Sequence, residues 1–377
     1  MANESLSAAK LAKNDEFYTQ YADIESELNA YISYNPEVFK DKTILLPCDD
    51  PEWSNFTKYF AQKFESLGLK KLISTSLAAE SKPEEIFYQP SLFEKDSPKF
   101  DEKKTRKNGK IFTLTKDNTG DGIVNFHDLE WDYLEGDGDF RSLEITKLRD
   151  EADIIITNPP FSLFREFLAW IMDGEKNFSI IGNMNAITYR EVFPLIMENK
   201  IWLGVSSGSK TYLKPDGTEH KMGNTCWFSN LEHGKRHEPL SLMTMEDNLR
   251  FNKTIEKTGY KKYDNYEAIE VPKVVAIPNN FDGIMGVPIS FLDKYNPDQF
   301  EILGATQRGC HDLVPDTKKY DSYWEVRQDG TKTGSSGNKT NENANLEMND
   351  GKKNYFINNE GHVIQSAYQR IFIRHKK

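Results

Sequence analysis

The residues with the clearest chemical potential form the sequence IIITNPPF at positions 154–161. The run of β-branched residues predicts a buried strand, and Asn158-Pro159-Pro160-Phe161 follows it directly. Proline has no backbone N–H, so the polar groups that this turn offers are carbonyl oxygens and the Asn158 side chain. The Asn158 oxygen and the Pro159 carbonyl would form a pair of acceptors for an exocyclic amino group, and Phe161 could stack on the ring that carries this amine.

Two acceptors that orient the hydrogens of an amino group favour a tetrahedral nitrogen, whose lone pair can attack a methyl sulfonium in line. We therefore interpret Asn158, Pro159, Pro160 and Phe161 as the catalytic residues of an amino-group methylation. The alternative is a proline-rich turn between a strand and a helix, with Ser162 as the helix cap and Phe161 in the core. The strand before the motif and the helical pattern after it favour the functional interpretation.

The elements that must position this motif alternate between strand-like and helix-like segments, which is typical of a parallel α/β sheet. Ligand sites in such folds lie at the carboxyl ends of the strands. A charged loop and an inserted hairpin, at about residues 77–130, interrupt the alternation. The expected buried strands are residues 43–48, 70–75, 152–157 and 178–182, and Asp50 is placed to cap the helix after the first of them.

The pattern changes in the second half of the chain. Residues 206–225 are rich in Gly, Ser, Lys and Thr and predict an exposed loop on one rim of the sheet. Residues 330–354 have the composition of a linker or a long loop. We predict a boundary near 235–245, which divides the chain into domains 1–240 and 241–377.

The composition is that of an ordinary soluble protein, with 37% hydrophobic and 28% charged residues, and it excludes collagen-like, coiled-coil and wholly disordered classes. The three cysteines lie far apart and no metal-ligand spacing is present, so we expect no metal and a reducing cytoplasm. No signal peptide or membrane span is expected, since about 18 consecutive apolar residues would be needed to span. The 48 Lys+Arg against 59 Asp+Glu give a net charge of −11, which at first argues against nucleic acid.

The catalytic motif and several other segments closely resemble the EcoRI family of adenine-specific DNA methyltransferases. The resemblance covers most of residues 14–303 in collinear order and is weakest at 77–130 and after 304. The matching segments are DEFYTQY (15–21), CDDP (48–51), SNF (54–56), GDGDFRS (136–142), TNPPFSLFRE (157–166), ITY (187–189), KIWLGV (200–205) and a block at 263–300 that contains MGVPI (285–289).

The resemblance implies a Rossmann-like sheet of the S-adenosylmethionine-dependent methyltransferases, followed by a C-terminal target-recognition region. The glycine-rich loop that usually follows the first strand is missing, so side-chain contacts are expected to replace backbone contacts there. Asp49 is favoured over Asp50, which fits a helix cap equally well. The residues that the resemblance assigns to S-adenosylmethionine are Phe17, Tyr18, Thr19, Cys48, Asp49, Asp50, Asp139, Phe140 and Asn158.

The implied reaction is methyl transfer to N6 of an adenine that is rotated out of double-stranded DNA. Trp227 and Phe228 fit a strand whose aromatic side chain helps to hold the flipped base, and core packing is the alternative for each. Two other functions stay open: methylation of RNA bases or protein glutamine, and DNA binding without catalysis. A monomer is expected, paired in function with a restriction endonuclease.

A DNA partner changes the meaning of the net charge. The acidic excess is expected on the outer helices, while lysine and arginine line a cleft beside Asn158. The candidates for phosphate contacts are Lys210, Lys214, Lys221, Arg308 and the tail 370–377.

Overall fold

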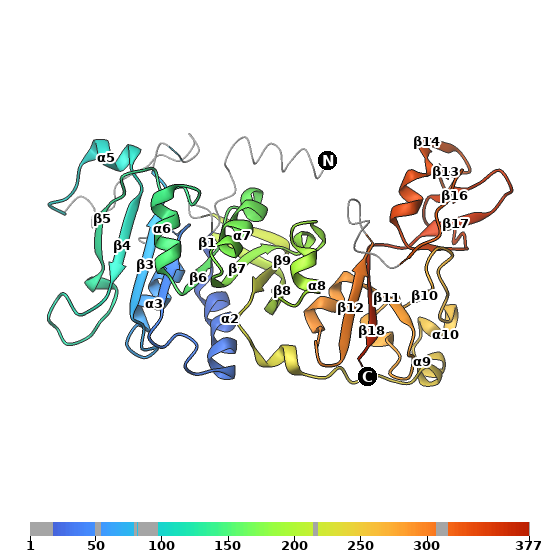
Figure 1. Cartoon of the computed structure of the whole chain (residues 1–377), viewed down its shortest axis with the longest axis horizontal. Helices are drawn as coiled ribbons and strands as arrows, with labels where there is room; N and C mark the ends of the chain where they lie inside the picture. Colours follow the sequence, from blue (N-terminus) through green and yellow to red (C-terminus); the bar gives the residue numbers. More distant parts are fainter. Residues whose placement is uncertain are drawn as a thin grey trace. The chain divides into compact units, whose positions relative to one another are not determined.

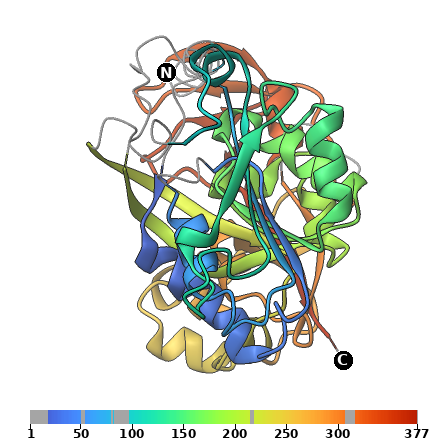
Figure 2. The same cartoon turned by 90° about the vertical axis from the view of Figure 1, so that its left-hand side faces the viewer.

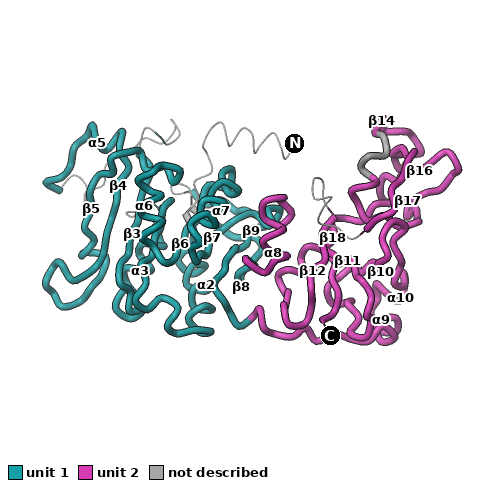
Figure 3. The backbone as a smooth tube through the Cα atoms, viewed as in Figure 1, with its two compact units in different colours: residues 1–186, 201–234 teal, residues 187–200, 235–377 magenta. Residues whose placement is uncertain are grey.

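The computed structural model describes residues 18–49, 54–78, 81, 97–213, 218–306 and 316–376. The chain folds as two compact units (Figure 3). Unit 1 comprises Met1–Ala186 and Ile201–Gly234, and unit 2 comprises Ile187–Lys200 and Lys235–Lys377. The chain thus enters unit 2 at Lys235, near the expected boundary, but the excursion of Ile187–Lys200 into unit 2 was not expected.

Within the described residues, unit 1 is built on a mixed nine-stranded sheet, so the protein is of the α/β class (Figure 1). The strand order is β1-β8-β9-β7-β6-β2-β3-β4-β5. All residues of β2 and β6 are buried, as expected for parallel strands that are covered on both faces. The parallel centre of the sheet consists of β7 (Asn177–Asn183), β6 (Ile154–Thr157), β2 (Thr43–Leu46) and β3 (Lys71–Ser76).

Helices cover both faces of this parallel centre. Residues of α2 (Tyr21–Tyr34) and α3 (Asn55–Gln62) share one core cluster with alternate residues of β2 and β6. The connections β2–α3–β3 and β6–α7–β7 run in opposite directions along the sheet. Because such crossovers are right-handed as a rule, α7 (Phe164–Asp173) is expected on the other face. Figure 2 shows α2 and α3 in blue on one side of the sheet and the green helices on the other.

The cap of α3 differs from the expected one. Its N-cap is Ser54, whose Oγ accepts hydrogen bonds from the backbone N–H groups of Phe56 and Thr57. Asp50, the expected cap, lies outside the described residues. Phe56 and Phe60 on this helix are buried, and so is Phe64 just after its end, so the helix turns one apolar face into the core.

Antiparallel strands complete both edges of the sheet. On one side, β4 (Lys110–Leu114) pairs with β3 and β5 (Glu130–Tyr133) pairs with β4, so both extend the main sheet. The expected hairpin was partly wrong, because the strand that pairs with β4 is Glu130–Tyr133 and not residues 123–126. On the other side, β9 (Glu219–Ser229) pairs with β7 and with β8 (Trp202–Leu213). The expectation of a loop at 206–225 was wrong, because the described part of this segment continues β8 and β9.

The described part of unit 2 contains a four-stranded and a five-stranded sheet. The first has the order β10-β11-β18-β12 and the second β14-β13-β16-β17-β15. The strands are β10 (Ala268–Glu270), β11 (Ile284–Pro288), β12 (Phe300–Ala305), β13 (Trp324–Val326), β14 (Lys332–Ser336), β15 (Asn345–Leu346), β16 (Tyr355–Ile357), β17 (Val363–Ser366) and β18 (Arg370–His375). The remaining α-helices of the described chain are α5 (Glu102–Lys107), α6 (Leu143–Glu151), α8 (Phe193–Met197), α9 (Met245–Phe251) and α10 (Ile255–Thr258).

Two expectations about unit 2 were wrong. The segment 330–354 is not a linker, because it supplies β14, β15 and the 3₁₀ helix η9 (Gly337–Glu342). The basic tail is not an exposed segment, because β18 pairs on both sides and Ile371, Phe372 and Ile373 are fully buried. Among the described residues, no helix has the length and apolar character required to cross a membrane.

Candidate functional site

The candidate site lies at the carboxyl edge of the parallel strands, where β2 and β6 are neighbours. From β2 the chain crosses to β3, and from β6 it crosses to β7 on the opposite side. Because the two connections leave in opposite directions, a ligand crevice is expected between the carboxyl ends of β2 and β6. Asp49 follows β2 and Asn158 follows β6, so both residues border this switch point.

A hydrogen-bonded network around Asp49 joins the carboxyl ends of β2, β3 and β6. The Asp49 carboxylate is 5% exposed and accepts hydrogen bonds from Ser54 Oγ at 2.9 Å and Thr157 Oγ1 at 2.7 Å. The Asp49 carbonyl accepts a third from Ser74 Oγ at 3.1 Å. Such donors offset the loss of solvent around a buried carboxylate. The network therefore ties Thr157, and with it the start of the Asn-Pro-Pro-Phe turn, to the turn after β2.

The Asn-Pro-Pro-Phe turn emerges from the buried strand β6. Asn158 and Pro160 are half-buried and Pro159 is buried. Phe161 begins the 3₁₀ helix η3 (Phe161–Leu163) and packs partly against the core cluster of α2 and α3. Ser162 lies inside this 3₁₀ turn and does not cap α7, whose N-cap is Leu163. The turn thus places Asn158 at the switch point, as its predicted role requires.

The GDGDF loop docks on the carboxyl end of β3. The Asp137 carbonyl accepts a hydrogen bond of 2.8 Å from the N–H of Ala78. Gly138 has a φ of 85°, and a Cβ at this position would lie 2.3 Å from the carbonyl oxygen of Ser76. Only glycine allows this close approach, so the sequence of the loop determines its position at the same edge as Asp49 and Asn158.

Asp139 on this loop is bound by Arg141. Its Oδ1 accepts hydrogen bonds of 2.9 Å from both the backbone N–H and Nε of Arg141, and Oδ2 accepts one of 2.5 Å from Nη2. The hydrogen bond to Asp139 raises the pKa of Arg141 above its ordinary value. Arg141 also donates to Glu166 at 3.3 Å, so the guanidinium has a second acidic partner.

Several aromatic residues that the sequence assigns to ligands lie in the core. Phe140 is 4% exposed and packs edge-to-face against Phe167 of α7 at 5.0 Å. Trp227 and Phe228 are fully buried, and the Trp227 ring meets Phe56 of α3 at 5.9 Å. A ring without an exposed face cannot stack on a base, so the structure favours the core alternative for Trp227 and Phe228.

The N-terminal segment reaches the start of α3. The strand β1 (Tyr18–Thr19) pairs with the end of β8, and the Thr19 carbonyl accepts a hydrogen bond of 2.8 Å from Asn55 Nδ2. Asn55 follows Ser54, so Thr19 lies beside the network around Asp49. Cys48 is half-buried in the turn after β2. Phe17 and Asp50 lie outside the described residues.

Two of the expected phosphate contacts have acidic partners inside the protein. Lys210 is 9% exposed and its Nζ lies 2.8 Å from Asp23. Arg370, also 9% exposed, forms an ion pair of 2.6 Å with Glu270. Both assignments are corrected, because these cations are buried and neutralised. Lys221 on β9 is exposed and keeps its candidacy, whereas Lys214 and Arg308 lie outside the described residues.

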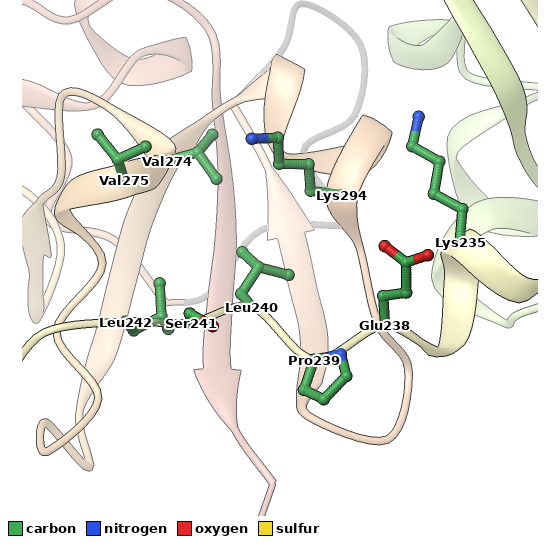
Figure 4. A pocket seen from close by; sticks show the side chains of 9 residues that line it. All are labelled: Lys235, Glu238, Pro239, Leu240, Ser241, Leu242, Val274, Val275 and Lys294. Carbon is green, nitrogen blue, oxygen red and sulfur yellow. The ribbon is translucent and has the colours of Figure 1, made fainter.

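Unit 2 contains a cavity of about 260 Å³ (Figure 4). None of its lining residues belongs to the network around Asp49. The residues that line it are Lys235, Glu238, Pro239, Leu240, Ser241, Leu242, Val274, Val275 and Lys294.

Three potential metal ligands also meet in unit 2. His362 Nε2 lies 3.6 Å from Asp264 Oδ1 and 3.9 Å from Glu347 Oε1. Lys318 Nζ lies 3.5 Å from the other Asp264 oxygen, and Tyr320 donates a hydrogen bond to the same atom. The Asp264 carboxylate therefore already has a lysine and a tyrosine hydroxyl as partners, beside its contact with His362.

Three residues of the site were not predicted from the sequence. Ser54 and Thr157 donate hydrogen bonds to the Asp49 carboxylate, and Arg141 forms an ion pair with Asp139. Thr157 directly precedes Asn158, and Ser54 lies in the SNF segment. Both residues belong to segments that resemble the family, and this was the signal in the sequence that could have identified them. Arg141 lies two residues after Asp139. Nothing in the order of residues shows that Thr157 and Asp49, more than 100 positions apart, share a hydrogen bond.

Comparison with known proteins finds similarity over most of the chain. The family model described as "Adenine-specific methyltransferase EcoRI" matches residues 5–376. The chain is 42% identical to the Type II methyltransferase M.EcoRI of Escherichia coli, over 80% of this chain and 89% of that protein. It is 34% identical to the Type II methyltransferase M.MpnI of Mycoplasma pneumoniae, over 84% of this chain and 89% of that protein. No solved structure matches the chain.

Proposed function

Because the chain belongs to the EcoRI family of adenine-specific methyltransferases, we propose that it methylates N6 of adenine at specific sites in double-stranded DNA. The observation that carries this proposal is the Asn158–Phe161 motif at the switch point between β2 and β6. The strand order β7-β6-β2-β3, with antiparallel β9 beside β7, supports a Rossmann-like methyltransferase sheet.

In this proposal Asn158 and Pro159 orient the target amine. The Asn158 side-chain oxygen and the Pro159 carbonyl accept its hydrogens and direct the nitrogen lone pair away from them. Phe161, half-buried at the start of η3, lies against one face of the adenine. S-adenosylmethionine supplies the activated methyl group, so the protein contributes orientation and exclusion of water.

The acidic groups at the carboxyl edge fit a cationic cofactor. Asp49 is bound through both carboxylate oxygens, yet each oxygen can accept more than one hydrogen bond. We assign Asp49 to the amino group of the methionine moiety or to the ribose hydroxyls. We assign Asp139 to the adenine amino group of the cofactor. Arg141 can keep its second partner, Glu166, when Asp139 turns to that amino group.

DNA recognition is assigned mainly to unit 2, with a contribution from exposed Lys221 on the β8–β9 hairpin. Rotation of the adenine out of the stack costs a few kcal/mol, which contacts to the DNA backbone and to the orphaned base must offset. A monomer that acts beside a restriction endonuclease of the same specificity is the biological setting that we propose.

The proposal is tested with labelled S-adenosylmethionine and three acceptors: duplex DNA, RNA and protein. We expect label on N6 of adenine in DNA, at a fixed sequence context found by mapping the modified sites. Transfer only to RNA or protein by folded, cofactor-binding protein would refute the DNA assignment.

The role of the motif is tested with Asn158→Ala. We expect kcat to fall at least about 100-fold, in line with the loss of a positioning group, while cofactor binding persists. The matched control is Asn177→Ala, an exposed asparagine at the amino end of β7, which should retain full turnover. Equal turnover in the two variants would remove Asn158 from catalysis.

A further inference from the structure

The strand β8 has an irregularity beside Trp227. The register of its pairing with β9 passes from Leu203 opposite Phe228 to Ser207 opposite Cys226. The segment 204–206 therefore faces one residue of β9 and forms a bulge. Bulges bend a strand and redirect the residues that follow.

The carboxylate of Glu27 from α2 occupies the inside of this bulge. Glu27 is fully buried, its Oε1 accepts the N–H of Val205 at 3.0 Å, and its Oε2 accepts the N–H and Oγ of Ser206 at 3.1 and 2.9 Å. Tyr31 donates a further hydrogen bond of 2.7 Å. A Cβ on Gly204 would lie 1.9 Å from Glu27 Oε1, so the glycine makes this approach possible.

Asp23, one helical turn before Glu27, holds the next part of the same strand. Residues four positions apart lie on one face of a helix. Asp23 Oδ1 accepts a bond of 2.8 Å from Lys210 Nζ, which also lies 3.3 Å from Ser206 Oγ. One face of α2 therefore fixes both the bulge and the segment that follows it.

The segment that these contacts fix crosses the carboxyl edge of the sheet. Asn183 ends β7 and pairs with Thr225, so residues 219–224 of β9 continue beyond β7. We call residues 207–213 and 219–224 the β8–β9 arm. The end of the arm pairs with β1, whose Thr19 is bound to Asn55. The arm thus reaches the side of the edge where Ser54 and Asp49 lie.

On the basis of the proposed function, we propose that Asp23 and Glu27 are positioning residues, which hold the β8–β9 arm over the carboxyl edge in the orientation that engages DNA. Lys210 acts through Asp23 and makes no phosphate contact, while Lys221 stays exposed on the arm. Glu27 accepts hydrogen bonds from backbone N–H groups of the bulge, and the geometry of the bulge sets the direction in which β8 continues.

Glu27→Gln tests the bulge contact. Glutamine keeps one acceptor oxygen but turns an NH₂ group toward a backbone or hydroxyl donor. We expect amide exchange in 207–213 to accelerate and KM for DNA to rise about tenfold, the effect of losing about 1.4 kcal/mol. The affinity for S-adenosylmethionine and kcat should stay within about twofold, since the network around Asp49 is untouched. Glu25→Gln is the matched control, because Glu25 lies on the same helix and pairs with Lys63.

A double-mutant cycle with Asp23→Asn and Lys210→Met separates positioning from phosphate binding. If Lys210 acts through Asp23, the double variant is no worse than the poorer single variant, and the salt dependence of DNA binding keeps its slope. A phosphate contact would instead give additive losses and reduce the slope by about 0.9. That result would overturn the role of the pair.

The outcomes also separate this inference from the proposed function. Wild-type protein that methylates no DNA contradicts the function. Unchanged amide exchange in the arm of Glu27→Gln, or equal losses of DNA and cofactor affinity, contradicts the positioning role whichever substrate is methylated.

Discussion

Replacing Thr157 by valine tests whether the network around Asp49 supports both the fold and the catalytic turn. The substitution removes one hydroxyl group and keeps the branched shape that suits β6. The lost bond is 2.7 Å long and ends on a carboxylate that is only 5% exposed. Hydrogen bonds to charged groups contribute about 1.5–3 kcal/mol. Ser54 remains as a donor to the other oxygen, so we expect the free energy of unfolding to fall by about 2 kcal/mol.

The same variant should lose activity beyond what its stability explains. Thr157 is the residue before Asn158, and without its anchor on Asp49 the turn can shift relative to the cofactor. A displacement of about 1 Å can reduce turnover about 100-fold. We therefore expect kcat to fall by about 10- to 100-fold at temperatures where the variant is fully folded.

Urea unfolding and single-turnover methylation are the two assays, with Thr157→Ser as the matched control. Serine keeps the hydroxyl group and should preserve most of the turnover. Valine and serine variants with equal stability and equal turnover would refute the reasoning, because the hydroxyl group would then contribute nothing. A stability loss without a loss of turnover would limit the network to a folding role.

Further predictions concern the loop, the buried ion pair and pH. Gly138→Ala should lower stability by about 1–3 kcal/mol and weaken cofactor binding in calorimetry, because its φ is 85° and the Cβ would meet β3; unchanged affinity would contradict the placement of the loop. Arg370→Met should cost about 3–5 kcal/mol in thermal unfolding by leaving Glu270 unpaired, whereas Arg374→Met should cost under about 1 kcal/mol; similar losses would contradict burial as the cause. Burial raises the pKa of Glu27, so its contribution to stability is full below its unfolded pKa and is lost as pH rises through the folded value. The difference in stability between wild type and Glu27→Gln should therefore change across that window, and a difference that stays constant with pH would contradict the shift.

The parallel centre of unit 1 could be predicted because its strands have no solvent-facing side. Burial on both faces selects the continuous apolar runs of β2 and β6. The β8–β9 hairpin could not be predicted in the same way. Its arm has one exposed face and is held by backbone pairing and by Glu27, so Gly, Ser, Lys and Thr are tolerated there.

Segment 330–354 was misjudged for a related reason. Its asparagines satisfy backbone groups and do not mark a flexible loop: Asn345 Nδ2 donates to the Thr340 carbonyl at 2.6 Å, and Asn345 N–H donates to Asn265. Asparagine-rich composition usually indicates turns, but a buried asparagine can instead stabilise the fold by hydrogen bonds to distant parts of the chain. Such partners, here 80 positions apart, are not visible along the chain.

The candidate site divides along the same line. The sequence predicted that Asn158, Asp49 and Asp139 lie near strand ends, because the Asn-Pro-Pro-Phe motif and the segments that carry the family resemblance are short and contiguous. It did not show that Asp49 is bound by Thr157 or that Asp139 is bound by Arg141. Those contacts depend on which strand ends become neighbours, and strand order is a property of the whole sheet.

The charge of the protein shows why a count of cations cannot locate a DNA surface. Lys210 and Arg370 were natural candidates for phosphate contacts, yet each is buried against its own carboxylate. A cation that is already paired and buried cannot neutralise a DNA phosphate, so it releases none of the counterions condensed on the DNA and does not contribute to the salt dependence of binding. Each such pair cancels within the net charge of −11, which therefore does not reveal it, whereas the lysine and arginine total overstates the number of cations that can attract DNA. What decides binding is the set of exposed cations that can reach a phosphate, and Lys221 on the β8–β9 arm is where that set can be tested first: Lys221→Met should lower the salt slope by about 0.9, and Lys210→Met should leave it unchanged.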